Sequence, residues 1–147
     1  KTTVHFIQAA IAYQTGDFEN AVRILRQASK NTRISFADKF VVICLDCIDD
    51  ELEREKVIET IKNSGKELIE ISEEQMQNFG GNMLQVQNSE GKKFLVMSQT
   101  AYQSLSQDQI SRIENYSEII YSNLETIEIN GGGSARCMLA EVFLTGK

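Results

Sequence analysis

The strongest constraint on the fold is the segment at residues 39–45, whose core Phe40-Val41-Val42-Ile43-Cys44 is an uninterrupted apolar run. A strand with apolar side chains at consecutive positions has no polar face, which is typical of a strand buried on both sides of its sheet. Such a strand needs a packed layer on each side. The run therefore favours an α/β domain in which helices and strands alternate along the chain.

The rest of the chain supports this alternation. We predict strands at residues 68–71, 83–86, 94–97, 119–121, 127–129 and 137–144. Between them, Val57 and Ile61 mark the apolar face of one helix. Ser106 and Gln109 form a capping-box pattern that begins a second helix, ending at about residue 114. The predicted strands at residues 83–86 and 94–97 flank a short turn and form a hairpin.

Residues 1–33 have a different pattern, which predicts a helical hairpin with a tight turn at Gly16 and Asp17. The stretch at residues 12–21, followed by Leu25 and Ala28, resembles one tetratricopeptide repeat. A solenoid needs about three such repeats to bury a continuous core. Two interpretations therefore stay open: a repeat-like hairpin that docks a partner, and an ordinary helical hairpin packed on the rest of the protein.

Composition and charge exclude several classes of protein. The 147 residues are 41% hydrophobic and 24% charged, which are globular values and exclude intrinsic disorder. The net charge of −6 makes a nucleic-acid-binding surface unfavourable. No apolar run approaches the roughly 18–20 residues of a membrane-spanning helix, so we expect no membrane insertion. The odd count of three cysteines indicates reduced thiols and a cytoplasmic protein.

The stretch most informative about chemistry is a glycine triplet, Gly131, Gly132 and Gly133, which precedes Cys137. Successive glycines allow unusual backbone torsions and close approach of the chain to another group. We expect the cysteine at the start of the last strand, at the rim of the sheet. The positive charge of Arg136 beside it favours the thiolate, the reactive form. From these residues alone, a structural thiol and a nucleophile both remain open.

Three stretches in order resemble the guanidino-group-modifying superfamily, which includes arginine deiminases, dimethylarginine hydrolases and amidinotransferases. Arg136-Cys137-Met138 after the glycines is similar to the superfamily's C-terminal signature. The stretch at residues 79–86, with Asn82 in its turn, looks like the family's glycine-asparagine turn, and residues 40–45 resemble an earlier strand. The subgroup that the sequence resembles most is the citrulline-utilisation hydrolase type, over residues 34–145.

The resemblance implies a fold and a chemistry. Its fold is a pseudo-fivefold propeller of ββαβ modules, the pentein propeller, so residues 34–147 would form the C-terminal part of such a propeller. Cys137 would be the nucleophile that attacks a guanidino or ureido carbon. Asn82, Gly132, Gly133 and Arg136 would contact a small substrate of the arginine or citrulline type, with Asn82 either structural or substrate-facing. We expect neither a metal nor a cofactor.

The sequence departs from this family in its proton-transfer residue and in its length. Where the subgroup has a histidine before the buried strand, counting back from Phe40 reaches Ser29, and the one histidine, His5, lies far upstream. A full family member is about twice as long, so the chain looks like a C-terminal half that follows a lost or separate part. We therefore expect impaired activity alone and association with a second copy or a complementing chain. The alternative is a non-catalytic interaction module that uses the hairpin.

Cys44 and Cys47 have the Cys-x-x-Cys spacing of a redox dithiol. A redox pair favours its first cysteine at a helix N-terminus, where the thiolate is stabilised. Here the first cysteine ends an apolar strand, which favours a buried structural thiol. Zinc would need two further ligands, which a single distant histidine does not supply.

Overall fold

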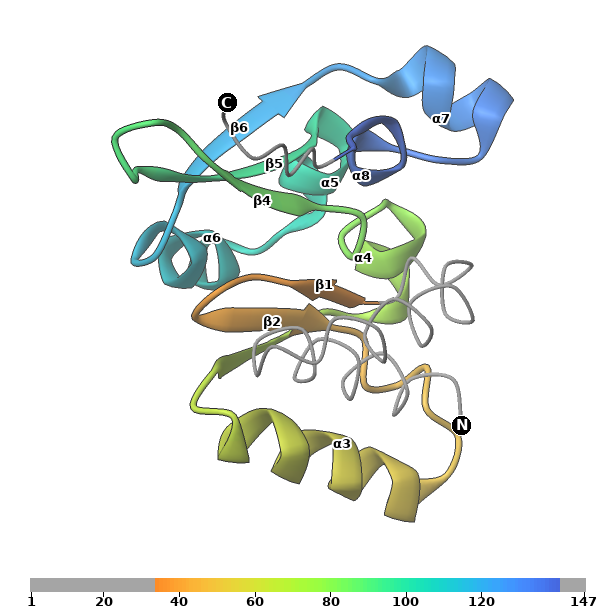
Figure 1. Cartoon of the computed structure of the whole chain (residues 1–147). Coiled ribbons are helices and arrows are strands. Elements are labelled where there is room, and N and C mark those ends of the chain that lie inside the picture. The colour runs from red at the N-terminus through yellow and green to blue at the C-terminus, as the bar shows by residue number, and fades with distance from the viewer. Residues whose placement is uncertain (1–33, 141–147) are drawn as a thin grey trace.

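The computed structural model describes residues 34–140, so the predicted hairpin and residues 141–147 lie outside the described part. The first sheet contains β1 (Ile34–Phe36), β2 (Phe40–Ile43) and β3 (Glu67–Glu70), in that order. β1 pairs antiparallel with β2, and β3 pairs parallel with it. The parallel connection runs through α3 (Glu51–Asn63), which lies along the lower face of this sheet in Figure 1.

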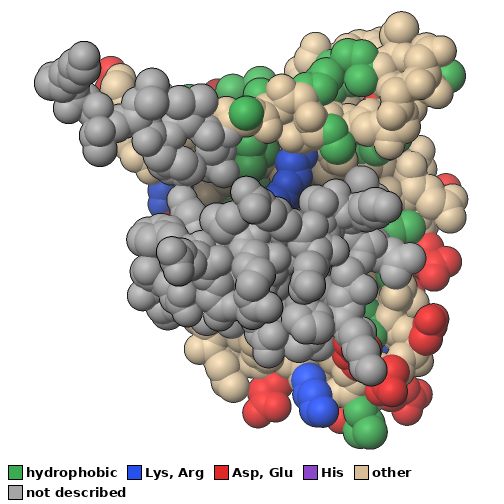
Figure 2. Space-filling view, turned by 45° about the vertical axis from the view of Figure 1, so that its right-hand side comes forward, with side chains coloured by type: hydrophobic (Ala, Val, Ile, Leu, Met, Phe, Trp, Pro, Cys, Tyr) green, Lys and Arg blue, Asp and Glu red, His purple; other side chains and the backbone are tan. Residues whose placement is uncertain are grey.

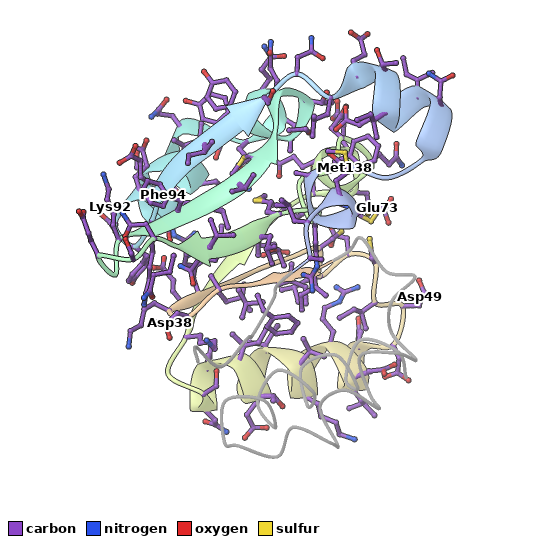
Figure 3. All side chains as sticks on the ribbon, turned by 45° about the horizontal axis from the view of Figure 1, so that its top comes forward. Asp38, Asp49, Glu73, Lys92, Phe94 and Met138 are labelled. Carbon is purple, nitrogen blue, oxygen red and sulfur yellow. The ribbon has the colours of Figure 1, made fainter. Side chains whose placement is uncertain are left out.

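The second sheet repeats this connectivity with β4 (Leu84–Gln87), β5 (Lys93–Ser98) and β6 (Glu118–Ser122). β4 and β5 form the predicted antiparallel hairpin, and β6 pairs parallel with β5 after the helices α5 (Gln99–Ser104) and α6 (Gln107–Glu114). Near the hairpin turn, the Lys92 ammonium lies 5.2 Å from the ring centre of Phe94 (Figure 3). The described residues thus form two units with the same β-β-α-β order, which confirms the predicted α/β class.

The buried strand β2 separates two hydrophobic clusters. On one face, Val41 and Ile43 pack with Val57 and Ile61 of α3. On the other face, Phe40, Val42 and Cys44 belong to a larger cluster, which also includes Ile69, Leu95, Met97, Ala101, Ile110 and Ile113. The second cluster joins the two sheets with α5 and α6 into one core. The uninterrupted apolar run is therefore explained by burial of both faces, as the sequence predicts.

The helix starts follow local hydrogen-bonding rules. The Asp50 carboxylate accepts a hydrogen bond from the Glu53 backbone N–H at 2.9 Å and caps α3. Acidic side chains gather around this helix on the surface (Figure 2). The capping box of Ser106 and Gln109 forms as predicted. None of the helices in residues 34–140 combines the length and the apolar character that crossing a bilayer requires.

The predicted strand at residues 127–129 and the predicted start of the last strand at Cys137 are wrong. Residues 127–129 lie in α7 (Glu125–Gly131), and Cys137 lies in the short helix α8 (Ala135–Met138). The rest of that last predicted strand, residues 141–144, lies outside the described part. The alternation Ile127-Glu128-Ile129 predicts a strand. In the structure Glu128 is buried and Ile129 is 74% exposed, because hydroxyl groups hold the carboxylate inside.

β1, α4 (Glu73–Gln77) and α5 have no counterpart among the elements predicted from the sequence. α4 begins with a capping box of Ser72 and Gln75, the same signal that identified α6. Its five residues are too few to show an apolar period, which is why the pattern gave no helix there.

The end of α4 is a tight turn that leads directly to Asn82. The Phe79 N–H bonds to the Met76 carbonyl at 3.0 Å, and the Gly80 N–H bonds to the Gln75 carbonyl at 2.8 Å. This is the Schellman pattern of helix termination, in which one residue takes a left-handed conformation. That residue is Phe79, with φ of 63°, where glycine is usual. Gly80 is the next residue, and an added Cβ there would lie 2.7 Å from the Gln75 oxygen.

We expect Gly80→Ala to destabilise the protein by about 1–3 kcal/mol, because its methyl group would press on backbone and open the turn. Urea denaturation followed by circular dichroism measures the change. Gly131→Ala is the matched control, since its added Cβ meets no atom closer than 3.9 Å. Equal stability of the two variants would contradict the close-approach argument.

Candidate active site

The side-chain amide of Asn82 connects the turn after α4 to the helix that carries Cys137. Asn82 is 2% exposed. Its Oδ1 accepts a hydrogen bond from the Arg136 backbone N–H at 2.9 Å, and its Nδ2 donates to the Cys137 Sγ at 3.2 Å. The backbone donor fixes the orientation of the amide, so the N–H side must face the sulfur. The structure therefore brings together Asn82, Arg136 and Cys137, which the sequence singled out separately.

The sequence predicts a special role for the three successive glycines, and the structure gives each of them a different environment. Gly132 ends α7 in the left-handed region, with φ of 64°, which lets the chain reverse direction towards α8. Gly133 lies against the cysteine, and an added Cβ there would be 3.1 Å from Cys137 Sγ and 3.0 Å from Cys137 Cβ. Gly131 is the last residue of α7, and an added Cβ there would make only an ordinary contact, with Ile127 at 3.9 Å. Two of the three glycines thus shape the surroundings of the thiol.

The thiol of Cys137 is exposed, whereas Cys44 is buried and Cys47 is half-buried. The Asn82 N–H donor holds the Cys137 sulfur in one position. Exposure and a fixed donor are the features that a nucleophilic thiolate requires. The arrangement around Cys137 can therefore support attack on an electrophilic carbon.

A buried carboxylate holds the other side of the glycine loop. Glu128 is 8% exposed, and its two oxygens accept hydrogen bonds from Ser134 Oγ at 2.6 Å and Thr100 Oγ1 at 2.7 Å. Burial raises the pKa of Glu128, but the hydroxyl donors Ser134, Ser98 and Thr100 outweigh it and hold the pKa below the ordinary value of 4.5. Because Ser134 precedes α8, this network ties Cys137's helix to β5 and α5.

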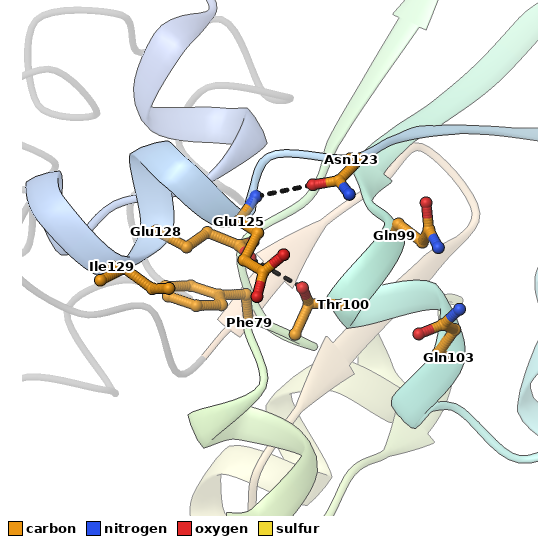
Figure 4. A pocket seen from close by; sticks show the side chains of 8 residues that line it. All are labelled: Phe79, Gln99, Thr100, Gln103, Asn123, Glu125, Glu128 and Ile129. Carbon is orange, nitrogen blue, oxygen red and sulfur yellow. Dashed lines mark hydrogen bonds between the residues drawn. The ribbon is translucent and has the colours of Figure 1, made fainter.

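Glu128 also lines a pocket of about 420 Å³ (Figure 4). The lining side chains are Phe79, Gln99, Thr100, Gln103, Asn123, Glu125, Glu128 and Ile129. The lining contains two carboxylates and neither a lysine nor an arginine, so its charge is negative. Cys137 is not part of this lining. The pocket and the thiol are separate features. The hydrogen bond from Ser134 to Glu128 connects the lining of the pocket to the segment just before Cys137.

Glu128, Ser134 and Thr100 were not among the site residues predicted from the sequence. The carboxylate lies between two isoleucines in a segment that the alternation predicts to be a strand. Its burial depends on the Ser134 hydroxyl, six residues further along, and on the Thr100 hydroxyl, 28 residues earlier, and no periodic pattern signals that pair. Neither His5 nor Ser29 falls in the described range. Within residues 34–140, no group of three potential ligands could hold a metal ion.

We expect Glu128→Gln to destabilise the protein at neutral pH by about 1–3 kcal/mol, because hydrogen bonds to a carboxylate are stronger than hydrogen bonds to an amide. The carboxylate's folded pKa lies below its unfolded value, so its contribution is complete above about pH 4.5 and is lost as the pH falls through the folded pKa. Urea denaturation at about pH 7, 5 and 3 measures the free energy of unfolding of the wild type and of the variant. A gap in unfolding free energy that stays constant down to the lowest pH would contradict this network.

We expect Gly133→Ala to slow the alkylation of Cys137 by iodoacetamide about two- to tenfold. The added methyl would displace the sulfur from the Asn82 donor, and a displaced rotamer costs about 0.5–1.5 kcal/mol. Mass-mapped alkylation under native conditions follows Cys137 alone. The control is Gly131→Ala, which leaves the sulfur untouched and should react at the wild-type rate. Unchanged alkylation in the position 133 variant would mean that Gly133 does not confine the thiol.

Comparisons with known proteins complete the description of this site. Neither the curated proteins nor the solved structures contain a significant match to the chain. A family model, described as N,N dimethylarginine dimethylhydrolase, eukaryotic, matches residues 8–144. The match extends over the Asn82 turn, the glycine loop and Cys137, the same segments that converge in the structure. By this match over nearly its whole length, the chain belongs to the N,N-dimethylarginine dimethylhydrolase family, within the guanidino-modifying superfamily.

Proposed function

We propose that this protein is part of a hydrolase that acts on a guanidino or ureido group, with Cys137 as its nucleophile. The observation that carries the proposal is the exposed Cys137, whose sulfur is fixed by the Asn82 amide and lies against Gly133. The family match supports a guanidino-group hydrolase as the kind of function.

The substrate proposed is a dimethylated guanidino group of the arginine type, following the family's description. Unmodified arginine and the ureido group of citrulline are the alternatives, the latter because of the resemblance to the citrulline-utilisation type. All of them present a flat carbon bonded to nitrogen, so one nucleophile serves each. A guanidinium also carries a positive charge, which suits the protein's overall charge of −6.

The proposed reaction proceeds in two halves. The Cys137 thiolate attacks the guanidinium carbon, a C–S bond forms, and the C–N bond to the dimethylated nitrogen breaks as that nitrogen takes a proton and leaves as dimethylamine. Water then attacks the same carbon, the C–S bond breaks, and a ureido product and the thiolate are released. Each half needs a group that moves a proton, a role that typically contributes about 10²–10⁴-fold.

The other residues are proposed to act on position and access. Both polar atoms of the Asn82 amide are occupied by Arg136 and Cys137, which favours a positioning role over direct contact with substrate. Gly133, whose added Cβ would lie 3.1 Å from the sulfur, keeps that side of the thiol free of a side chain, and Gly132 is proposed to allow the turn before it. Arg136 is next to Cys137 in the chain, and contact with the substrate's carboxylate is the role proposed for it.

We further propose that the two β-β-α-β units are neighbouring blades of a pentein propeller. Ser35 donates a hydrogen bond to the Met83 carbonyl at 2.8 Å and joins one unit to the next. Ile120, Tyr121, Met138 and Leu139 are each more than 40% exposed around β6 and α8, an apolar surface that suits a further blade. A complementing chain or a second copy would supply it. The alternative function as an interaction module rests on residues 1–33, outside the described range, and stays a prediction.

We expect covalent labelling of Cys137 without turnover by this chain alone. Attack by the thiolate needs only Cys137 and its donor, whereas hydrolysis needs a proton-transfer group. The one histidine of the chain, His5, lies outside the described residues, and Ser29 stands where the family's histidine is expected. Chloroacetamidine, a reactive cationic amidine, provides the label, and mass mapping locates it. Release of dimethylamine from dimethylarginine measures turnover.

Cys137→Ala is the control for both measurements. Labelling at Cys44 or Cys47 in preference to Cys137, or slower reaction than a free small thiol shows, would overturn Cys137 as the nucleophile. Turnover at an enzyme-like rate that disappears in Cys137→Ala would uphold the hydrolase and contradict the expected lack of turnover. The two results therefore separate the role of Cys137 from the question of whether a second chain is needed.

A further inference from the structure

Two of the three cysteines lie together, away from Cys137. Cys44 follows directly after β2, and the turn that begins there is closed by a hydrogen bond from the Ile48 N–H to the Leu45 carbonyl at 3.0 Å. The turn folds Cys47 back over Cys44, and their sulfur atoms are 2.8 Å apart. We propose that Cys44 and Cys47 are a redox modification site that forms a reversible disulfide.

The two sulfurs differ in access, and this difference assigns their roles. Cys44 is 1% exposed and belongs to the core cluster that joins the two sheets. Cys47 is half-buried and packs against the edge of that cluster. An oxidant therefore reaches Cys47 first, and Cys44 lies beside it as the resolving thiol. A helix N-terminus matters where the first cysteine of the pair is the one that reacts first. Here the cysteine proposed to react first is the second one, Cys47, which is partly exposed.

The proposed oxidant is a peroxide. The Cys47 thiolate attacks one oxygen of hydrogen peroxide, the O–O bond breaks, and a sulfenic acid forms with release of water after proton transfer. Cys44 then attacks the Cys47 sulfur, the S–O bond breaks, and a second water leaves. In total, two thiols and one peroxide give one disulfide and two waters. A dithiol reductant reverses the step by exchange through a mixed disulfide.

The surroundings of the pair connect it to the rest of the fold. Cys47 Sγ also lies 3.6 Å from the Met76 sulfur, on α4. α4 leads into the turn that carries Asn82, the partner of Cys137. The pair and Cys137 therefore lie at opposite ends of one short segment. Cys137 Sγ is held by Asn82, and the pair closes on itself, so the disulfide should exclude Cys137.

Thiol trapping of the whole chain tests the proposal. The reduced protein is exposed to a small excess of hydrogen peroxide, quenched with N-ethylmaleimide under denaturing conditions, and weighed as an intact chain. The reduced protein should take three labels, one for each cysteine. After oxidation, two labels should disappear together, and peptide mapping should place the disulfide between Cys44 and Cys47. Dithiothreitol should restore all three.

Single-cysteine variants identify which thiols form the disulfide. Cys47→Ser, at the half-buried position, should abolish the paired loss, while Cys137→Ser should preserve it. Because Cys44 lies in the core, Cys44→Ala serves as a second variant only if its circular dichroism matches the wild type. A disulfide that includes Cys137, a disulfide between two chains, or unpaired oxidation of Cys47 to sulfinic acid would each overturn the proposal.

Discussion

The burial of both faces of β2 is the constraint on which the rest of the structure depends. Its four residues are at most 1% exposed. Side chains of this size contribute about 1.5–3 kcal/mol each when they are fully buried. One face requires α3, and the other requires the second sheet with its helices. Both β-β-α-β units are thus held by the same strand, and the site at α8 depends on this arrangement of the two units.

Two buried polar side chains then hold the reactive loop. The Asn82 side chain, in the turn after α4, makes hydrogen bonds to α8. Glu128 bonds to Ser134 from the side of β5 and α5. A buried amide or carboxylate is stable only when its hydrogen bonds are satisfied, so each of these groups fixes the geometry of its partners. The exposed thiol gains its position from groups that are themselves inaccessible.

The structure places the three cysteines in two different settings. Cys137 lies on an exposed helix with a donor at its sulfur, and Cys44 and Cys47 lie at the end of a buried strand. The two settings differ in the way that separates a reactive surface thiol from a resolving core thiol. α4 and its terminal turn lie between them, with Phe79 in a left-handed conformation that costs about 1–2 kcal/mol. This strained turn is where the fold positions Asn82.

The sequence by itself determined the α/β class, because an apolar run without alternation is typical of a strand buried on both faces. It also determined the β4–β5 hairpin and the α6 capping box, because these signals are local. Only the tertiary structure decided that residues 125–131 and 135–138 are helices, because the choice depends on hydroxyl groups that bury Glu128. The contacts of Asn82 with Cys137, and of Cys47 with Met76, likewise join distant positions. A local pattern cannot encode such pairs, since long-range packing brings them together.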